Sequence, residues 1–344
     1  MRDPGTACRF GWVAALAFVA CAPPDPAERV ADLVESARAT AGGDHQFVFG
    51  ELCEGPIEAV GAAPVMGAVP PALPNTNPEI GDWYTDPVQV FDDLFYLGQT
   101  RFAVWGVRTS EGIVLIDAIF DYSVEAEVID GLGRLGIDPA DIRYVIISHA
   151  HGDHSAGAGV LQQRYGVQVV MSEADWDLYE TSGREPIKAT RDIVATDGYE
   201  IRLGDHVLTT YLTPGHTHGT ISTLIQDVHD DGERHVAAVW GGTLFNFRDS
   251  PDDPRQQRLV DYAESARRFR EITSEAGVDI LLSNHPPYDG STVKIPMLAQ
   301  RGVGDPHPYV IGQDAVSRYL TVAEQCAVAA RIAESELVGG EAVE

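Results

Sequence analysis

The 344-residue sequence has few basic residues, few cysteines and no long run of apolar residues. Only 24 lysines and arginines stand against 52 aspartates and glutamates, so the formal net charge is −28. A surface this acidic repels nucleic-acid phosphates and anionic lipid head groups, which argues against nucleic-acid-binding functions. The apolar stretches are also too short to cross a bilayer as stable helices.

The four cysteines are widely separated, and none belongs to a Cys-x-x-Cys pair. This spacing argues against a thiolate-bound structural zinc ion and against a redox dithiol. The sequence also lacks the Gly-x-Ser-x-Gly pattern that carries the nucleophile of many serine hydrolases. Two of the cysteines, Cys53 and Cys326, can form one disulfide in an oxidising compartment or remain separate thiols.

The N-terminal residues have the pattern of an export signal. Residues 1–20 contain Arg2 and Arg9, and a short apolar stretch follows that ends in small residues. Residues 19–21 (Val-Ala-Cys) resemble a bacterial lipobox, in which Cys21 carries the lipid. We therefore expect an exported protein that is a periplasmic or membrane-anchored lipoprotein or is simply secreted, and that touches a membrane only through the lipid on Cys21.

The remaining chain divides into two parts. Residues 21–82 are rich in proline, alanine and glycine and are predicted to be a tether and N-terminal extension, with one short helix over residues 27–39. Residues 83–344 are predicted to form one domain. Its alternating patterns predict a layered α/β fold. The expected strands are residues 91–97, 102–109, 112–118, 144–147, 167–171, 199–212 (a hairpin), 221–226, 235–240 and 279–282, and the expected helices are 124–135, 155–165, 259–275 and 315–334.

Four candidate metal ligands lie within six residues, directly after the predicted strand 144–147. They are His149, His151, Asp153 and His154. The period-2 spacing of His149 and His151 lets both side chains project to one side of an extended chain. Imidazoles suit zinc, and a strand end is rigid enough to fix their geometry.

Two further histidines complete the number of ligands that two metal ions need. His216 lies in a Gly/Pro turn between two predicted strands, and His285 follows the predicted strand 279–282. The ligands then form two sets of three: His149, His151 and His216, and Asp153, His154 and His285. Three protein ligands per zinc ion leave one coordination position open, which is the catalytic arrangement.

These segments resemble the metallo-β-lactamase superfamily. Residues 149–154 (HAHGDH) fit its signature HxHxDH, and residues 213–219 (TPGHTHG) and 281–286 (LLSNHP) are similar to its other ligand segments. The chain is most similar to the third β-lactamase subclass, which is rich in histidine ligands and has no zinc-binding cysteine. The resemblance covers residues 83–334. It implies an α/β fold, the four-layer αβ/βα sandwich of two mixed sheets flanked by helices.

The resemblance also implies the chemistry. It indicates a zinc-dependent hydrolase with two zinc ions per chain, which opens β-lactam rings by attack of a metal-bound hydroxide and so provides antibiotic resistance. Asp153 would both bind metal and orient the nucleophile. Asp117 would either support a ligand, as in the family, or simply end a strand. The substrate is then a small cyclic amide. Two alternatives stay open: a related hydrolase that acts on a lactone, an ester or another cyclic amide, and a zinc-binding lipoprotein without catalysis.

The segment 240–246 (WGGTLFN) bears on the choice of substrate. It has neither the bridging aspartate of many superfamily hydrolases nor the cysteine of other lactamases. Thr243 stands near a serine of the third subclass, so a catalytic and substrate-binding role is expected for it. Phe245 takes the place of a second serine, which helps to hold the β-lactam carboxylate in that subclass.

Other residues near the ligand segments are expected at the pocket rim: Asn246, Asn284 and Tyr288. His218 either supports a ligand or faces outward. The remaining histidines are not expected to be ligands: His45, His206, His229, His235 and His307.

Overall fold

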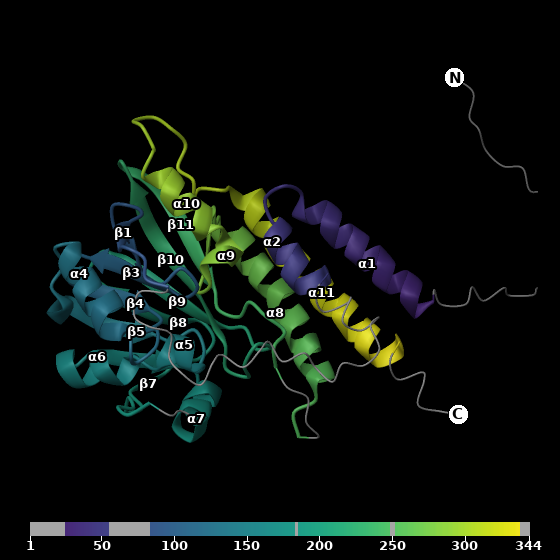
Figure 1. The fold of residues 1–344 in the computed structure, drawn as a ribbon, viewed down its shortest axis with the longest axis horizontal. Coiled ribbons are helices and arrows are strands. Elements are labelled where there is room, and N and C mark those ends of the chain that lie inside the picture. Colours follow the sequence, from purple (N-terminus) through teal and green to yellow (C-terminus); the bar gives the residue numbers. More distant parts are fainter. Residues whose placement is uncertain (1–24, 55–82, 183–184, 248–251, 338–344) are drawn as a thin grey trace, which may run out of the picture.

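The computed structural model describes residues 25–54, 83–182, 185–247 and 252–337. Two β-sheets pack face to face, and helices cover both outer faces (Figure 1). This is the predicted four-layer αβ/βα sandwich, and the fold class is confirmed. The predicted signal sequence and Cys21 lie outside the described residues. None of the helices in the described ranges combines the length and apolar character needed to cross a membrane.

The first sheet has seven strands, which follow one another in space in chain order from β1 to β7. The first four pair antiparallel, and β4 to β7 pair parallel. The strands are β1 (Val88–Gln89), β2 (Leu94–Gly98), β3 (Ala103–Thr109), β4 (Gly112–Ile116), β5 (Ile142–Ile146), β6 (Gln168–Met171) and β7 (Ile193–Val194).

The second sheet has five strands in the order β12-β11-β10-β9-β8. Its neighbours are antiparallel except β11 and β12, because a long helix returns the chain between these two strands and allows them to run parallel. The strands are β8 (Tyr199–Leu203), β9 (His206–Leu212), β10 (Ile221–Asp230), β11 (Glu233–Trp240) and β12 (Ile280–Ser283).

Helices form the outer layers and the connections. The first sheet is covered by α4 (Asp130–Arg134), α6 (Ala158–Tyr165) and α7 (Glu173–Ser182), and the second by α8 (Arg255–Ala276) and α11 (Gln313–Ile332). The other helices are α1 (Pro26–Ala41), α2 (Gln46–Phe49), α5 (Gly152–Ser155), α9 (Pro286–Asp289) and α10 (Ser291–Leu298), with short 3-10 or π turns at Gly50–Glu54 (η1), Glu125–Ile129 (η2), Pro139–Asp141 (η3) and Ala333–Leu337 (η4).

Three apolar clusters hold the four layers together. Side chains of both sheets, among them Trp105 and Val239, fill the space between the sheets. Leu161 of α6 and Trp176 of α7 pack in the cluster on the outer face of the first sheet. The third cluster lies between the second sheet and the helices that cover it, α8 and α11. Burial of so much apolar surface fixes the sheet edges against each other.

The predicted elements are present, but two of the predicted helices are divided, and the short strands β1 and β7 and the helices α2, α7, α9 and α10 were not predicted. The predicted helix 124–135 is a π turn followed by α4, and the predicted helix 155–165 is divided between α5 and α6. The second division falls at Gly157, whose backbone approaches Ala118 so closely that a Cβ atom would lie 2.1 Å from the Ala118 oxygen. Helix α7 was missed because four of its ten residues are acidic, which hides its buried face.

Residues 25–54 pack onto the domain rather than forming a free tether. Helix α1, which includes the predicted helix 27–39, lies beside α11 (Figure 1). A disulfide joins Cys53 to Cys326 of α11, which resolves the choice between a disulfide and two thiols. The described part of the predicted tether is therefore covalently fixed to the last helix.

Candidate metal centre

The six candidate ligands meet at one edge of the sandwich, where strands of both sheets end. His149, His151, Asp153 and His154 follow β5, His216 lies between β9 and β10, and His285 follows β12. The backbone joins the sheets here, because Ile221 N donates to Ser148 O at 2.7 Å and Ala103 N donates to Asn284 O at 2.9 Å. Strand ends anchored in this way hold the ligand segments firmly.

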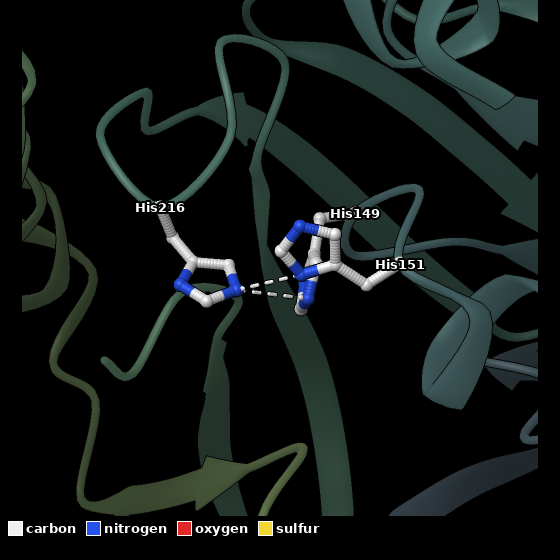
Figure 2. A group of neighbouring side chains, drawn as sticks. All are labelled: His149, His151 and His216. Carbon is white, nitrogen blue, oxygen red and sulfur yellow. Dashed lines mark hydrogen bonds between the residues drawn. The ribbon is translucent and has the colours of Figure 1, made fainter. Parts of the chain in front are cut away.

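The first triad consists of His149, His151 and His216 (Figure 2). His216 Nε2 lies 3.1 Å from His149 Nε2 and 3.1 Å from His151 Nδ1. His149 and His216 are almost fully buried, and His151 is half-buried. Three imidazole nitrogens thus converge on one point beside solvent.

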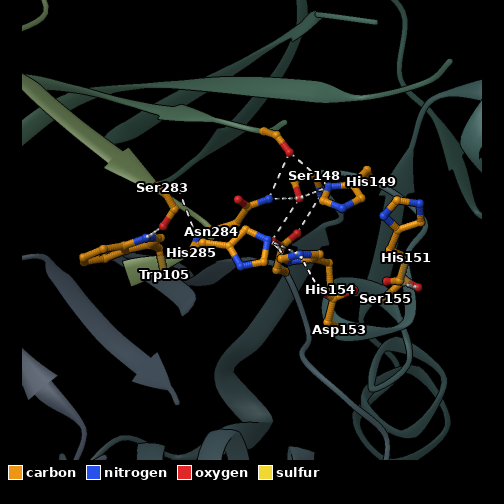
Figure 3. Close-up of polar contacts among 12 residues, drawn as sticks. Trp105, Ser148, His149, His151, Asp153, His154, Ser155, Ser283, Asn284 and His285 are labelled. Carbon is orange, nitrogen blue, oxygen red and sulfur yellow. Dashed lines mark hydrogen bonds and ion pairs between the residues drawn. The ribbon is translucent and has the colours of Figure 1, made fainter. Parts of the chain in front are cut away.

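The second triad consists of Asp153, His154 and His285 (Figure 3). His154 Nε2 lies 3.3 Å from Asp153 Oδ2 and 3.3 Å from His285 Nε2. The His149 and His154 ring centroids are 4.3 Å apart, so the two triads are adjacent. The structure therefore brings together both sets of three residues that the sequence predicts.

The rings are oriented by oxygen atoms behind them. Nδ1 of His149, His216 and His285 lies 2.8–3.1 Å from the carbonyl oxygens of Gly241, Leu244 and Arg101 respectively. A carbonyl can only accept, so these nitrogens carry the hydrogen and Nε2 presents a lone pair to the triad. Converging lone pairs repel one another unless a cation lies between them. Imidazoles and one carboxylate are a donor set that fits zinc.

Burial and charge set the protonation of the triads. Burial lowers the pKa values of His149 and His216 well below the usual range, so both rings stay neutral, as ligands must be. Burial and the neighbouring His154 lower the pKa of His285 to about 4. Burial opposes a charge on His154, but the carboxylates of Asp153 and Asp117 outweigh it and raise its pKa. A cation in the second triad therefore has to displace the His154 proton.

Asp117 supports the centre from the end of β4. Its carboxylate accepts from Ser148 N at 2.7 Å and from Ser148 Oγ at 2.9 Å, and it lies 2.9 Å from His154 Nδ1. The residue has a φ of 69°, a left-handed conformation that aspartate adopts more readily than bulky residues. This contact gives Asp117 the supporting place that the family resemblance implies.

Two buried charged residues, Asp175 and Arg258, were missed from the sequence. The Asp175 carboxylate accepts from Ala150 N, Thr217 Oγ1 and Gly219 N at 2.9–3.1 Å, so it ties the segment of His149 and His151 to the loop of His216. Arg258 holds the same loop from α8 and donates to Gly215 O at 2.7 Å and to His216 O. No sequence pattern marks either residue, because each meets the ligand loops only after folding.

Replacing Asp175 with alanine is expected to weaken zinc binding by the first triad about 10–100-fold, the usual cost of losing a residue that orients ligands. The loss follows because two backbone amides and a hydroxyl lose their common acceptor. The zinc dissociation constant, measured by competition with a chromophoric chelator, checks this. Asp177→Ala is the matched control, since Asp177 lies on the same helix with its side chain 67% exposed. Equal zinc affinity in the two variants would contradict the role of Asp175.

A cavity of about 330 Å³ opens beside the first triad. His151 and His216 line it, with Asn246, His218 and Phe247 on other sides. His218 Nε2 lies 3.1 Å from Asp253 Oδ1, at the cavity wall rather than behind a ligand. The cavity places one of the predicted rim residues, Asn246, where a substrate can reach it.

The other predicted rim residues lie elsewhere. Asn284 is buried behind the triads, where its Nδ2 donates to Ser148 Oγ and Gly241 O. Tyr288 is buried among the helices of the second sheet, and Thr243 is buried with its hydroxyl oxygen lacking a hydrogen-bond partner in the described structure. None of these three lines the cavity, because the chain turns inward after β11 and β12. Phe245 packs edge-on against Tyr262 in the same helical layer.

Comparison with known proteins agrees with this geometry. Residues 103–229 match the family model of the metallo-β-lactamase superfamily. The crystal structure of BJP-1, a subclass B3 metallo-β-lactamase of Bradyrhizobium japonicum, is 25% identical, covers 72% of this chain and 94% of its own, and superposes with a TM-score of 0.62. The predicted resemblance to the metallo-β-lactamase superfamily is therefore confirmed. Within it, the predicted resemblance to the third β-lactamase subclass, B3, is confirmed.

Curated relatives carry several different activities. The "Probable polyketide biosynthesis zinc-dependent hydrolase BaeB" of Bacillus velezensis is 28% identical over 35% of this chain and 48% of its own length. The acyl-coenzyme A thioesterase MBLAC2 of Bos taurus is 27% identical over 59% of this chain and 81% of its own. The N-acyl homoserine lactonase AttM of Azorhizobium caulinodans is 26% identical over 47% of this chain and 65% of its own length. The chain thus spans about half of the length of BaeB and just under two thirds of the length of AttM.

Proposed function

We propose that this protein is a zinc-dependent hydrolase that opens β-lactam rings, with two zinc ions per chain. The observation that carries the proposal is the pair of adjacent triads beside an open cavity. His149, His151 and His216 would hold one ion, and Asp153, His154 and His285 the other. The likeness to a subclass B3 β-lactamase over 94% of that enzyme supports the substrate class.

The residues of the chain have separate tasks in this reaction. When bound, zinc supplies Lewis acidity, which activates water and polarises a carbonyl group. The neighbouring imidazoles, above all His154, offset the burial of Asp153 and lower the pKa of its carboxyl, so that group is ionised at neutral pH and can accept a hydrogen bond from the attacking water. Asn246 and His218 offer polar groups to the substrate from the cavity wall.

The zinc-loaded protein is expected to hydrolyse a chromogenic cephalosporin and a carbapenem with kcat/KM of at least about 10⁴ M⁻¹ s⁻¹, in the ordinary range for enzymes. A chelator should remove the activity and added zinc should restore it. An acyl-homoserine lactone and an acyl-coenzyme A thioester complete the panel. Zinc binding without turnover of either β-lactam would overturn the proposal.

One observation favours a second candidate, a related hydrolase of lactones, esters or other cyclic amides. Phe245 replaces the serine that would hold a β-lactam carboxylate, and its ring lies in the core rather than in the cavity. A lactonase and a thioesterase are among the relatives. Turnover of the lactone or the thioester alone in the same panel would favour this candidate.

We further propose that the protein is exported and anchored by a lipid on Cys21. The signal-like residues 1–20 and the Cys53–Cys326 disulfide support this, because disulfides persist in oxidising compartments. Mass spectrometry of the N-terminal peptide from the native membrane fraction tests it. A peptide that carries no lipid would exclude the anchor.

A further inference from the structure

A separate group of potential metal ligands lies at the other end of β10. Asp93 precedes β2, His206 begins β9, and His229 is near the end of β10. Asp93 Oδ2 lies 3.1 Å from His206 Nε2 and 2.6 Å from His229 Nδ1. Ile221, at the start of β10, is hydrogen-bonded to Ser148, the residue before His149 of the candidate metal centre. The eight residues from Ile221 to His229 span roughly 26 Å at 3.3 Å per residue.

The carboxylate and one imidazole of this group are held firmly. Asp93 Oδ1 accepts from His229 N at 3.1 Å, and Asp93 O accepts from Arg108 N at 2.7 Å. The second nitrogen of the His206 ring, Nδ1, lies 3.2 Å from Asp205 Oδ1. A carboxylate behind the ring is the usual support of a metal-binding histidine, since it fixes the ring and raises its basicity.

The group also has a route to solvent. The His206 side chain is 2% exposed and that of Asp93 is 12% exposed, whereas that of His229 is 41% exposed. Asp93 and His206 thus form the buried side of the group, and His229 forms its solvent-exposed side, where water can complete the coordination of an ion. The three ligand atoms lie within 4.8 Å of one another, as do those of each triad of the candidate metal centre.

A second histidine–aspartate contact, in the five-stranded sheet, shows by comparison what distinguishes this group from an ordinary pair. His235 Nδ1 lies 2.7 Å from Asp279 Oδ2, but no third ligand of the described residues joins this pair. Around Asp93, two imidazoles from different strands converge on one carboxylate oxygen. Two imidazoles and a carboxylate are a donor set for zinc and related divalent transition metals. The net charge of −28 further favours the approach of cations.

We propose that Asp93, His206 and His229 form a peripheral binding site for a divalent transition-metal ion of the zinc type. The site is separate from the candidate metal centre and takes no part in hydrolysis. It joins Asp93 of the first sheet to two strands of the second. An ion here holds the sheets together at the end remote from the cavity.

The test counts zinc ions bound to the full chain. Wild type, His229→Gln and His235→Gln are dialysed to equilibrium against free Zn²⁺ at pH 7.5, and bound zinc is measured by elemental analysis. His229→Gln is expected to bind one ion fewer per chain than wild type, while His235→Gln binds the wild-type number. Asp93→Asn should lose the same ion, and thermal unfolding verifies that each variant is folded.

The outcome is independent of the proposed hydrolase activity. If His229→Gln and Asp93→Asn, both folded, bind as many ions as wild type at the zinc concentration that saturates wild type, the site does not exist. If His235→Gln also loses an ion, the loss is not specific to the group, and the proposal is overturned as well. The test counts bound zinc ions, so it remains valid if the β-lactamase proposal fails. The rate of hydrolysis by His229→Gln should equal that of wild type.

Discussion

Replacing His216 with alanine is expected to lower both the zinc affinity of the first triad and kcat/KM for a cephalosporin by about 10³-fold or more. The reduction should exceed the roughly 10–100-fold cost of losing a residue that merely supports a ligand. His216 Nε2 contacts both of its partners at 3.1 Å, so its loss removes the nitrogen that closes the triad. Equilibrium zinc binding and steady-state kinetics, measured on the same preparation, provide the two readouts.

His218→Ala is the matched control, two residues along the same loop. The His218 side chain is 57% exposed and pairs with Asp253 at the cavity wall, so its loss should leave zinc affinity within about threefold of wild type. It can raise KM, because it lines the cavity. If His216→Ala retains wild-type zinc affinity, His216 is not a ligand and the assignment of the first triad fails.

Removing the Cys53–Cys326 disulfide is expected to lower the free energy of unfolding by about 2–5 kcal/mol. The two cysteines are 273 residues apart, so the bond closes a very long loop and restricts the unfolded chain strongly. It also fixes the segment of α1 and α2 against α11, where both sulfur atoms are buried. Urea unfolding of the zinc-saturated protein, with and without a thiol reductant, measures the effect.

The double variant Cys53→Ala/Cys326→Ala is the control for this experiment. It should unfold at the lower urea concentration of the reduced wild type, and the reductant should not shift its midpoint further. If wild type unfolds at the same urea concentration in oxidising and reducing buffer, the bond does not stabilise the protein. In that case the packing of α1 on α11 is sufficient by itself to hold the N-terminal segment.

The six candidate ligands could be predicted because their pattern is local. Four of them lie within six residues directly after β5, and the period-2 spacing of His149 and His151 was enough to predict that they share one side, although both lie in the bend after the strand. His216 and His285 also follow from local signals, since each stands in a loop next to a strand end. The layers of the fold were predictable for the same reason, because buried strands and long helices leave clear apolar patterns.

Residues that act through tertiary contacts could not be predicted in this way. Asp175 and Arg258 belong to helices and meet the ligand loops only when the layers close. Asn284 and Tyr288 were expected at the rim because they are near His285 in sequence, but the turn after β12 carries them inward. The contacts of Asp93 with His206 and His229 could not be predicted either, because Asp93 lies more than 100 residues from both in sequence.

Each triad takes its members from both halves of the sandwich: two from the segment after β5, and one from a loop of the second sheet. An ion held in either triad is therefore a cross-link between the halves, and neither half can bind it alone. The chain must lose such an ion before the sheets can separate. The free energy of unfolding therefore depends on the concentration of free zinc. At a free zinc concentration 100 times the dissociation constant, each ion adds about 2.7 kcal/mol to the free energy of unfolding. Under zinc starvation the protein would then unfold and be degraded by proteases, and would not only lose its activity.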